Sequence, residues 1–207
     1  MLQSYAFEMI GTAVFAITGV LAVTRRGLDV FGAMVLGVVT AIGGGTLRDL
    51  IIRVPVFWTN DFNYVWAALA GGLAAFSITP LFRTRYRILL YLDGLGAALF
   101  AIAATQKVLA LQMSGPIAVT MGILTGIGGG LIRDVLAGRP TLLMSREIYA
   151  TPILIGCTIF VLFQAYMPDF ALAAPLAATV IFGLRAFAIH RGLEIPAWLT
   201  YQEQHKD

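Results

Sequence analysis

Two copies of one short motif place charged side chains inside apolar segments of this 207-residue sequence. The motif reads Gly-Gly-Gly-x-x-Arg-Asp and occupies residues 43–49 and 128–134. A charge at the centre of a membrane costs about 2.5–3.5 kcal/mol on insertion scales, so it normally faces protein or water and has a partner. With two carboxylates on other apolar segments, the candidate intramembrane charges are Glu8, Arg48, Asp49, Asp93, Arg133 and Asp134. Such groups predict ion pairing or contact with ions.

The segments that carry these charges are long enough to cross a bilayer. The composition is 59% hydrophobic and 12% charged, whereas soluble domains average about 25% charged residues. A helix that spans the hydrocarbon core needs roughly 20 apolar residues. We therefore predict an all-α, polytopic membrane protein with seven transmembrane helices, at residues 5–24, 30–53, 63–82, 87–108, 115–137, 147–166 and 169–190.

The basic residues predict the orientation of the chain, because Lys and Arg concentrate in the cytoplasmic loops of membrane proteins. With these seven helices, ten of the 14 Lys and Arg residues fall on one side, two fall on the other, and two are the motif arginines. We expect a multi-pass protein of the cell membrane with its N-terminus outside and its C-terminus in the cytoplasm. Basic residues in such short loops report orientation and predict no nucleic-acid partner.

The two motifs belong to a longer internal repeat with an offset of 128 − 43 = 85 residues. Without a gap, the same offset aligns Glu8 with Asp93 and Gly37 with Gly122. Each copy contains three helices, and an odd number reverses the direction of the chain, so the copies are predicted to be inverted. We expect one transmembrane domain over residues 1–207, with repeat one at about 5–82, repeat two at about 87–166 and an additional helix at about 169–190.

The triple glycines have two interpretations. Each glycine costs about 1 kcal/mol relative to alanine inside a helix, so three in a row can mark a functional break whose carbonyls contact ions. Alternatively, small residues let membrane helices pack closely. Repetition of the triplet before Arg-Asp favours the break. The predicted pore or kink residues are Gly43, Gly44, Gly45, Gly128, Gly129 and Gly130, with Thr40 and Thr125 one turn earlier.

Depth in the membrane predicts the partners of the charges. Glu8 and Arg48 lie in the outer halves of their helices, and the inverted copy places Asp93 and Arg133 in the inner halves. We predict two polar clusters, Glu8 with Arg48 and Asp93 with Arg133, on either side of the glycines. The alternative is that these ion pairs only hold the helices together. Lys107 has no basic counterpart in repeat one and is expected to extend to the outer interface.

Motifs for other chemistry are missing from the sequence. It contains no G-x-S-x-G nucleophile site, no Walker A sequence and no His/Cys cluster with zinc-ligand spacing. The sequence therefore predicts no enzyme activity, no catalytic residue, no metal site and no cofactor, apart from a permeant potassium or sodium ion.

With seven helices, inverted three-helix repeats and the doubled Gly-Gly-Gly-x-x-Arg-Asp motif, residues 5–190 resemble the trimeric intracellular cation (TRIC) channels, and especially their bacterial and archaeal members. The resemblance implies a homotrimer in which each protomer has its own pore for monovalent cations, mainly potassium. It also implies that the first, second, fourth and fifth helices bound the pore, which is kinked at the glycine triplets. Membrane lipid is an expected partner. The same bacterial group includes proteins with a glycine-transporter-like domain.

Three functions are consistent with these features. In a passive cation channel, carbonyls and threonine hydroxyls replace part of the hydration shell of the ion. In a secondary transporter of a small zwitterion such as glycine, half-helix N-termini hold the carboxylate of the substrate, and Asp49 or Asp134 holds its ammonium group. In a scaffold protein, the glycines only permit close packing. The channel is the favoured hypothesis.

Overall fold

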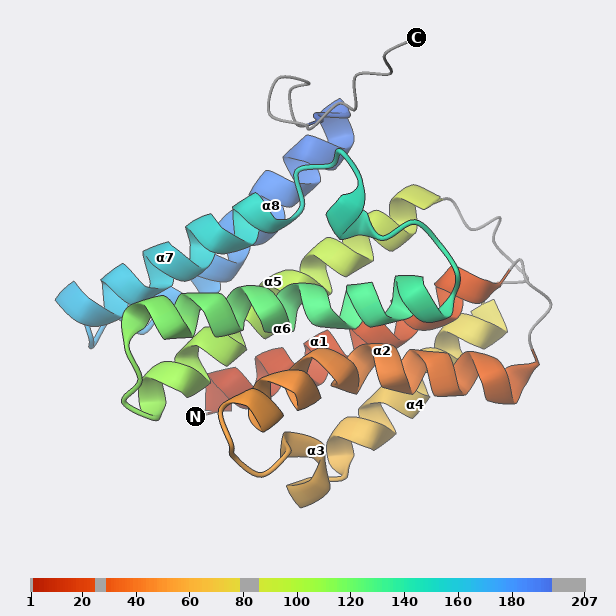
Figure 1. The fold of residues 1–207 in the computed structure, drawn as a ribbon, viewed down its shortest axis with the longest axis horizontal. Coiled ribbons are helices and arrows are strands. Elements are labelled where there is room, and N and C mark those ends of the chain that lie inside the picture. Colours follow the sequence, from red (N-terminus) through yellow and green to blue (C-terminus); the bar gives the residue numbers. More distant parts are fainter. Residues whose placement is uncertain (1, 25–28, 79–85, 195–207) are drawn as a thin grey trace, which may run out of the picture.

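The computed structural model describes residues 2–24, 29–78 and 86–194, and these residues are almost entirely helical (Figure 1). In chain order the elements are α1 (Leu2–Val23), α2 (Val30–Ile51), α3 (Phe57–Asn60), α4 (Asn63–Ile78), α5 (Tyr86–Ala110), α6 (Gly115–Leu136), the 3-10 helix η2 (Leu142–Met144), α7 (Ala150–Tyr166) and α8 (Ala173–Arg191). The described residues form no β-strand, and one isolated bridge joins Glu147 to Glu194. The all-α prediction is confirmed.

Five of these helices are long and apolar enough to cross a membrane: α1, α2, α5, α6 and α8. The apolar helices α4 and α7 are shorter, with 16 and 17 residues. Residues 79–82, the predicted end of the third span, lie outside the described residues. The prediction of seven spanning helices therefore stays a prediction for α4 and α7. The one-turn helix α3 was not predicted, because four residues are too few to show a period.

The ends of α2 and α6 show how closely the two repeats agree. Asp29 begins α2 by accepting a hydrogen bond from the backbone of Gly32 at 2.8 Å. After α2, Arg53 has a φ of 56°, and after α6 its equivalent, Gly138, has a φ of 55°. Glycine adopts this left-handed conformation freely, whereas an arginine there is strained. The backbone conformation is therefore repeated even where the residue type is not.

The contacts between α1 and α5 are reciprocal. Phe15 of α1 stacks on its equivalent Phe100 of α5, with ring centroids 5.4 Å apart and planes at 11°. Each ring also packs on a glycine of the other helix, because a Cβ on Gly96 would lie 2.9 Å from Phe15 and one on Gly11 would lie 3.0 Å from Phe100. Reciprocal contacts of this kind are expected between two units that are related by a two-fold axis. Figure 1 shows α1 antiparallel to α5, and α2 antiparallel to α6, as inverted repeats require.

Helix α8 has no counterpart in repeat one, and it breaks the two-fold relation. Gly71 of α4 packs on the backbone of Ala13 in α1. Its equivalent, Gly156 of α7, instead packs on Ala177 and Ile181 of α8. The additional helix therefore covers α7 and α5 on one side of the molecule only.

Candidate functional site

The glycine triplets do not interrupt their helices. Helix α2 is continuous through Gly43–Gly45, and α6 is continuous through Gly128–Gly130. The two helices are therefore not interrupted at the triplets in this structure, and the role of the glycines as pore or kink residues stays a prediction. The physical reason lies in the surroundings of the triplets, because the absence of side chains on these glycines lets the two helices come into close contact.

The two triplets meet each other where α2 crosses α6. A Cβ on Gly44 would overlap the carbonyl oxygen of Thr125 and lie 3.1 Å from the amide nitrogen of Gly129. Reciprocally, a Cβ on Gly129 would lie 2.5 Å from the carbonyl oxygen of Thr40. The backbones of α2 and α6 are therefore in direct contact, which only glycine permits at these positions. Close packing, the alternative interpretation of the triplets, describes this crossing.

The threonines predicted to line a pathway lie beside the crossing and are fully buried. Thr40 is 0% exposed and Thr125 is 1% exposed. Each hydroxyl donates a 2.6 Å hydrogen bond to a carbonyl four residues earlier in its own helix, that of Leu36 or that of Met121. A hydroxyl that donates in this way keeps both lone pairs of its oxygen to accept from neighbours. The role of the threonines as pathway residues stays a prediction.

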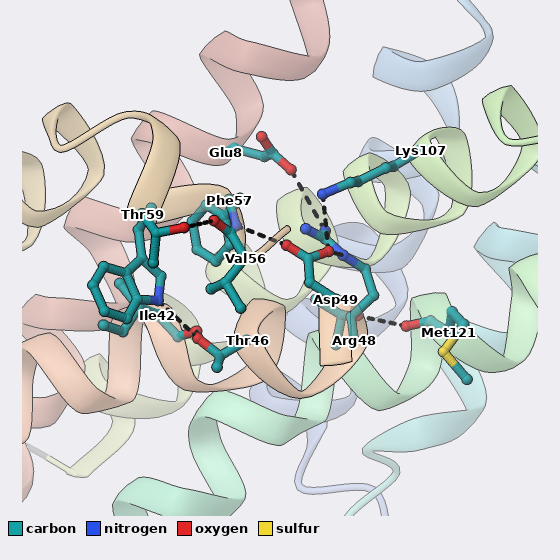
Figure 2. A network of polar contacts seen from close by, with 12 residues as sticks. Glu8, Ile42, Thr46, Arg48, Asp49, Val56, Phe57, Thr59, Lys107 and Met121 are labelled. Atoms are coloured by element: carbon teal, nitrogen blue, oxygen red, sulfur yellow. Dashed lines mark hydrogen bonds and ion pairs between the residues drawn. The ribbon is translucent and has the colours of Figure 1, made fainter. Parts of the chain in front are cut away.

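At one end of the crossing lies the Arg48 cluster, which we define as Glu8, Arg48, Asp49, Tyr64 and Lys107. Nη1 of Arg48 lies 3.5 Å from Oε1 of Glu8, and Nε of Arg48 lies 2.7 Å from Oδ1 of Asp49. Tyr64 donates a 2.6 Å hydrogen bond to Oε2 of Glu8. Nζ of Lys107 lies 2.8 Å from Oδ1 of Asp49. Figure 2 shows Arg48 and Lys107 converging on Asp49 from different helices.

At the other end lies the Arg133 cluster, which we define as Asp93, Arg133, Asp134 and Tyr149. Nη1 of Arg133 lies 2.6 Å from Oδ1 of Asp93, and Nε of Arg133 lies 2.9 Å from Oδ1 of Asp134. Arg133 and Asp93 are both completely buried. The two predicted ion pairs, Glu8 with Arg48 and Asp93 with Arg133, are therefore present, at equivalent places in the two repeats.

The aspartate of each motif also fixes the loop that follows its helix. Oδ2 of Asp49 accepts a 2.9 Å hydrogen bond from the backbone of Phe57. Oδ2 of Asp134 accepts a 3.2 Å hydrogen bond from the backbone of Leu142, which is the equivalent of Phe57. Each aspartate therefore joins the arginine of its own motif to a loop that folds back over the end of the crossing.

Lys107, which the sequence predicted to extend to the outer interface, has a partner that was not predicted. It is 29% exposed and forms an ion pair with Asp49, which gives the Arg48 cluster two cations for two carboxylates. The repeat could not have identified this pair, because in the equivalent Arg133 cluster one arginine serves two carboxylates, Asp93 and Asp134. In the other repeat, Lys107 is replaced by Ala22, whose carbonyl accepts a 3.3 Å hydrogen bond from Arg139.

The Arg133 cluster contains polar atoms that have no hydrogen-bond partner. Oδ2 of Asp93, Nη2 of Arg133 and the hydroxyl of Tyr149 are all buried and unsatisfied. In the Arg48 cluster the equivalent tyrosine, Tyr64, is bonded to Glu8. Asp93 is one methylene shorter than Glu8, and its bond to arginine, at 2.6 Å, is shorter than the 3.5 Å contact between Glu8 and Arg48. Only one of the two tyrosines is therefore anchored to its cluster.

A second arginine, Arg185 of α8, holds Tyr149 from the opposite side. Its guanidinium carbon lies 4.8 Å from the centroid of the Tyr149 ring. Nη2 donates to Oε2 of Glu147 at 2.8 Å, and Nη1 donates to the carbonyl of Ile148 at 2.9 Å. In the sequence analysis, Arg185 was only one of the basic residues counted to predict the orientation of the chain. No repeat signal identifies it, because α8 has no copy in repeat one.

Two ion-paired clusters lie at opposite ends of a buried crossing of helices. Within the described residues, no group of three His, Cys, Asp or Glu side chains could hold a metal ion. A continuous passage through the protomer requires α2 and α6 to separate, because Gly44 and Gly129 are buried in their contact.

Comparison with known proteins agrees with the doubled architecture. The family model described as "Glycine transporter" matches residues 5–80 and, separately, residues 90–165. A UPF0126 membrane protein of Vibrio cholerae is 40% identical over 193 residues, which cover 91% of this chain and 81% of that protein. The solved structure of the TRIC trimeric intracellular cation channel orthologue from Rhodobacter sphaeroides has a TM-score of 0.89 and 36% identity, covering 93% of this chain and all of that one. Another solved structure, concerned with conductance through TRIC cation channels, has a TM-score of 0.81 and 30% identity, covering 95% and 98% of the two chains.

Proposed function

We propose that this chain is a multi-pass membrane protein that conducts monovalent cations. It belongs to the family described as "Glycine transporter" and is a prokaryotic-type member of the TRIC channels. The observation that carries the proposal is the agreement with a TRIC channel orthologue over 93% of the chain at 36% identity. The solved relatives are channels and not enzymes, in accordance with the lack of catalytic motifs in the sequence.

The pathway that we propose passes between α1, α2, α5 and α6, from one cluster to the other. These four helices supply the reciprocal contacts at the centre of the protomer, and each of them carries one of the four cluster carboxylates. In the conducting state the helices bend at the glycine triplets, and the contact between Gly44 and Gly129 opens. Carbonyls and the hydroxyls of Thr40 and Thr125 then become available to a partly dehydrated ion.

The finer parts of this proposal are potassium as the main permeant ion, a homotrimer with one pore in each protomer, and contact with membrane lipid. The orthologue from Rhodobacter sphaeroides is described as trimeric, which supports the homotrimer. We also propose that the N-terminus is outside and the C-terminus cytoplasmic, because Lys and Arg lie mainly on one side. The Arg48 cluster is then the outer one, and the Arg133 cluster is the inner one.

Recording from purified protein in planar bilayers tests the proposal. We expect discrete unitary currents under asymmetric KCl, with a reversal potential close to that of potassium and far from that of chloride. A reversal potential that follows chloride, or a bilayer without unitary currents, would contradict the proposal. Cross-linking in detergent, followed by electrophoresis, should give a product of three chains.

A secondary transporter of a small zwitterion is the second candidate, and the description of the matching family model supports it. In that case Asp49 or Asp134 would contact the ammonium group of the substrate. Uptake of radiolabelled glycine into proteoliposomes distinguishes the two functions. Saturable uptake without unitary currents would favour the transporter, whereas currents without uptake would favour the channel.

A further inference from the structure

The two ends of the proposed pathway are closed in different ways. At the Arg48 end, Tyr64 is anchored by its 2.6 Å hydrogen bond to Glu8, and its ring packs edge-on against Tyr5 and Phe57. At the Arg133 end, the hydroxyl of Tyr149 is buried without a hydrogen-bond partner. Tyr64 is therefore joined to the carboxylate of its cluster by a short hydrogen bond, whereas Tyr149 has no bond of that kind.

Tyr149 nevertheless occupies the inner end of the glycine triplet of α6. A Cβ on Gly130 would lie 2.9 Å from the hydroxyl of Tyr149 and 2.8 Å from Oδ1 of Asp93. The tyrosine is only 4% exposed, so it fills the space between the glycine and the end of the protomer. At the equivalent glycine of α2, Gly45, this position is taken by the apolar ring of Phe57. The inner end is thus closed by a phenol group that lies beside Gly130 and Asp93.

Arg185 of α8 lies over the ring of Tyr149, with its guanidinium carbon 4.8 Å from the ring centroid. Arg185 is 2% exposed, and its bonds to Glu147 and to the carbonyl of Ile148 attach it to the residues just before Tyr149. Its Cγ also packs on Gly94 of α5, beside Asp93, since a Cβ there would lie 2.8 Å from this atom. One arginine therefore joins α8, α5 and the start of α7 behind the tyrosine.

The space on the far side of Arg185 is open. A cavity of about 190 Å³ lies between the first turn of α5 and the last turns of α8, and Arg185, Glu147, Tyr86 and Arg87 are among its lining residues. If Arg185 is released from Glu147, its charged group can move into this cavity and be solvated there. The ring of Tyr149 then loses its support, whereas Tyr64 at the other end remains bonded.

We propose that Arg185 is the latch of an inner gate, in which the arginine and Glu147 hold Tyr149 over Gly130. The latch belongs to the one long helix outside the repeats, so movement of α8 controls the inner end of the pathway alone. This inference rests on the proposed channel function. Arg185 is a positioning residue, since it acts on the pathway through Tyr149.

Single-channel recording of Arg185→Gln tests the latch. Loss of two charge-assisted hydrogen bonds and one cation–π contact should raise the ratio of open to closed time by about tenfold or more. The unitary conductance should stay at its wild-type value, because Arg185 does not line the pathway. Glu147→Gln removes the ion pair but keeps the contact of Arg185 with Tyr149, so it should act in the same direction to a smaller extent.

Arg191→Gln is the matched control. Arg191 belongs to the last turn of α8 and also lies over an aromatic ring, that of Phe187 at 5.6 Å, but it is exposed, whereas Arg185 is buried. We expect its gating to equal that of the wild type. Size-exclusion chromatography and thermal unfolding in detergent identify any variant that fails to fold, in which case Glu147→Gln carries the test.

The outcomes separate the latch from the channel function. A wild-type protein without unitary currents refutes the proposed function. A conducting wild type, with folded Arg185→Gln and Glu147→Gln variants that gate as the wild type does, refutes the latch alone. An equal change in Arg191→Gln also refutes it, because the effect would then follow from charge on α8 and not from Tyr149.

Discussion

The crossing of α2 and α6 gives a sharp prediction, because two adjacent glycines of one helix face different neighbours. A Cβ on Gly44 meets backbone atoms of α6, the carbonyl oxygen of Thr125 and the amide nitrogen of Gly129. A Cβ on Gly43 meets only the end of the Ile132 side chain, at 2.6 Å. Backbone atoms cannot rotate away, whereas a side-chain methyl group can. Gly43→Ala and Gly44→Ala are therefore a matched pair that adds the same methyl group one residue apart.

The expected magnitudes follow from two opposing effects. In either variant, alanine favours the helix over glycine by about 1 kcal/mol. Overpacking costs about 1–3 kcal/mol, and the backbone contact of Gly44 belongs at the upper end of that range. We expect Gly43→Ala to raise the free energy of unfolding by up to about 1 kcal/mol and Gly44→Ala to lower it by about 2 kcal/mol. For a chain of this size, the two melting temperatures should differ by about 6–12 °C.

Thermal unfolding in one detergent, followed by tryptophan fluorescence and by size-exclusion chromatography, measures this difference. The double variant Gly44→Ala/Gly129→Ala adds a second test. A single separation of α2 from α6 relieves both overlaps, so its cost should be smaller than the sum of the two single costs. Equal melting temperatures for Gly43→Ala and Gly44→Ala would refute the close crossing. Fully additive costs for Gly44→Ala and Gly129→Ala would refute its reciprocity.

Three further predictions concern single contacts. Lys107→Met should lower the free energy of unfolding by about 1 kcal/mol, since the ion pair with Asp49 is partly solvated, and this loss should vanish in an Asp49→Asn background. Asp93→Glu lengthens the carboxylate by one methylene, to the length of Glu8, and should raise the melting temperature by strengthening its contact with Tyr149; this gain should disappear when Tyr149→Phe is added, which a double-mutant cycle of melting temperatures measures. Arg53→Gly should raise the free energy of unfolding by about 1 kcal/mol, because it removes a strained left-handed arginine; an unchanged or lower melting temperature would contradict this.

The ion pairs could be predicted from the sequence because the repeat constrains them twice. The 85-residue offset relates Glu8 to Asp93 and Arg48 to Arg133, so one inferred pair implies the other. The inverted arrangement follows from the number of helices in each copy. These inferences use only the alignment of the two repeats and the position of each residue along its predicted helix, both of which can be read from a sequence.

The state of the glycine helices could not be predicted in the same way. A break in a helix and a close crossing both require residues without a Cβ, so Gly44 and Gly129 satisfy either interpretation. The difference lies in what faces each glycine, which depends on how α2 and α6 cross. Lys107 and Arg185 were missed for a related reason, since the repeat has no basic residue at position 22 and no copy of α8.

The reciprocal contacts between the repeats also bear on how the chain enters the membrane. Phe15 and Gly44 find their partners, Phe100 and Gly129, only after a further 85 residues have been synthesised. During translation the first three helices therefore enter the bilayer before the second repeat exists, and lipid covers their glycine-lined face until then. That face is complementary to the second repeat of any copy of this chain, so two nascent chains made close together can exchange halves. Short delays in insertion of α5 and α6 should thus favour intertwined assemblies over correctly paired protomers.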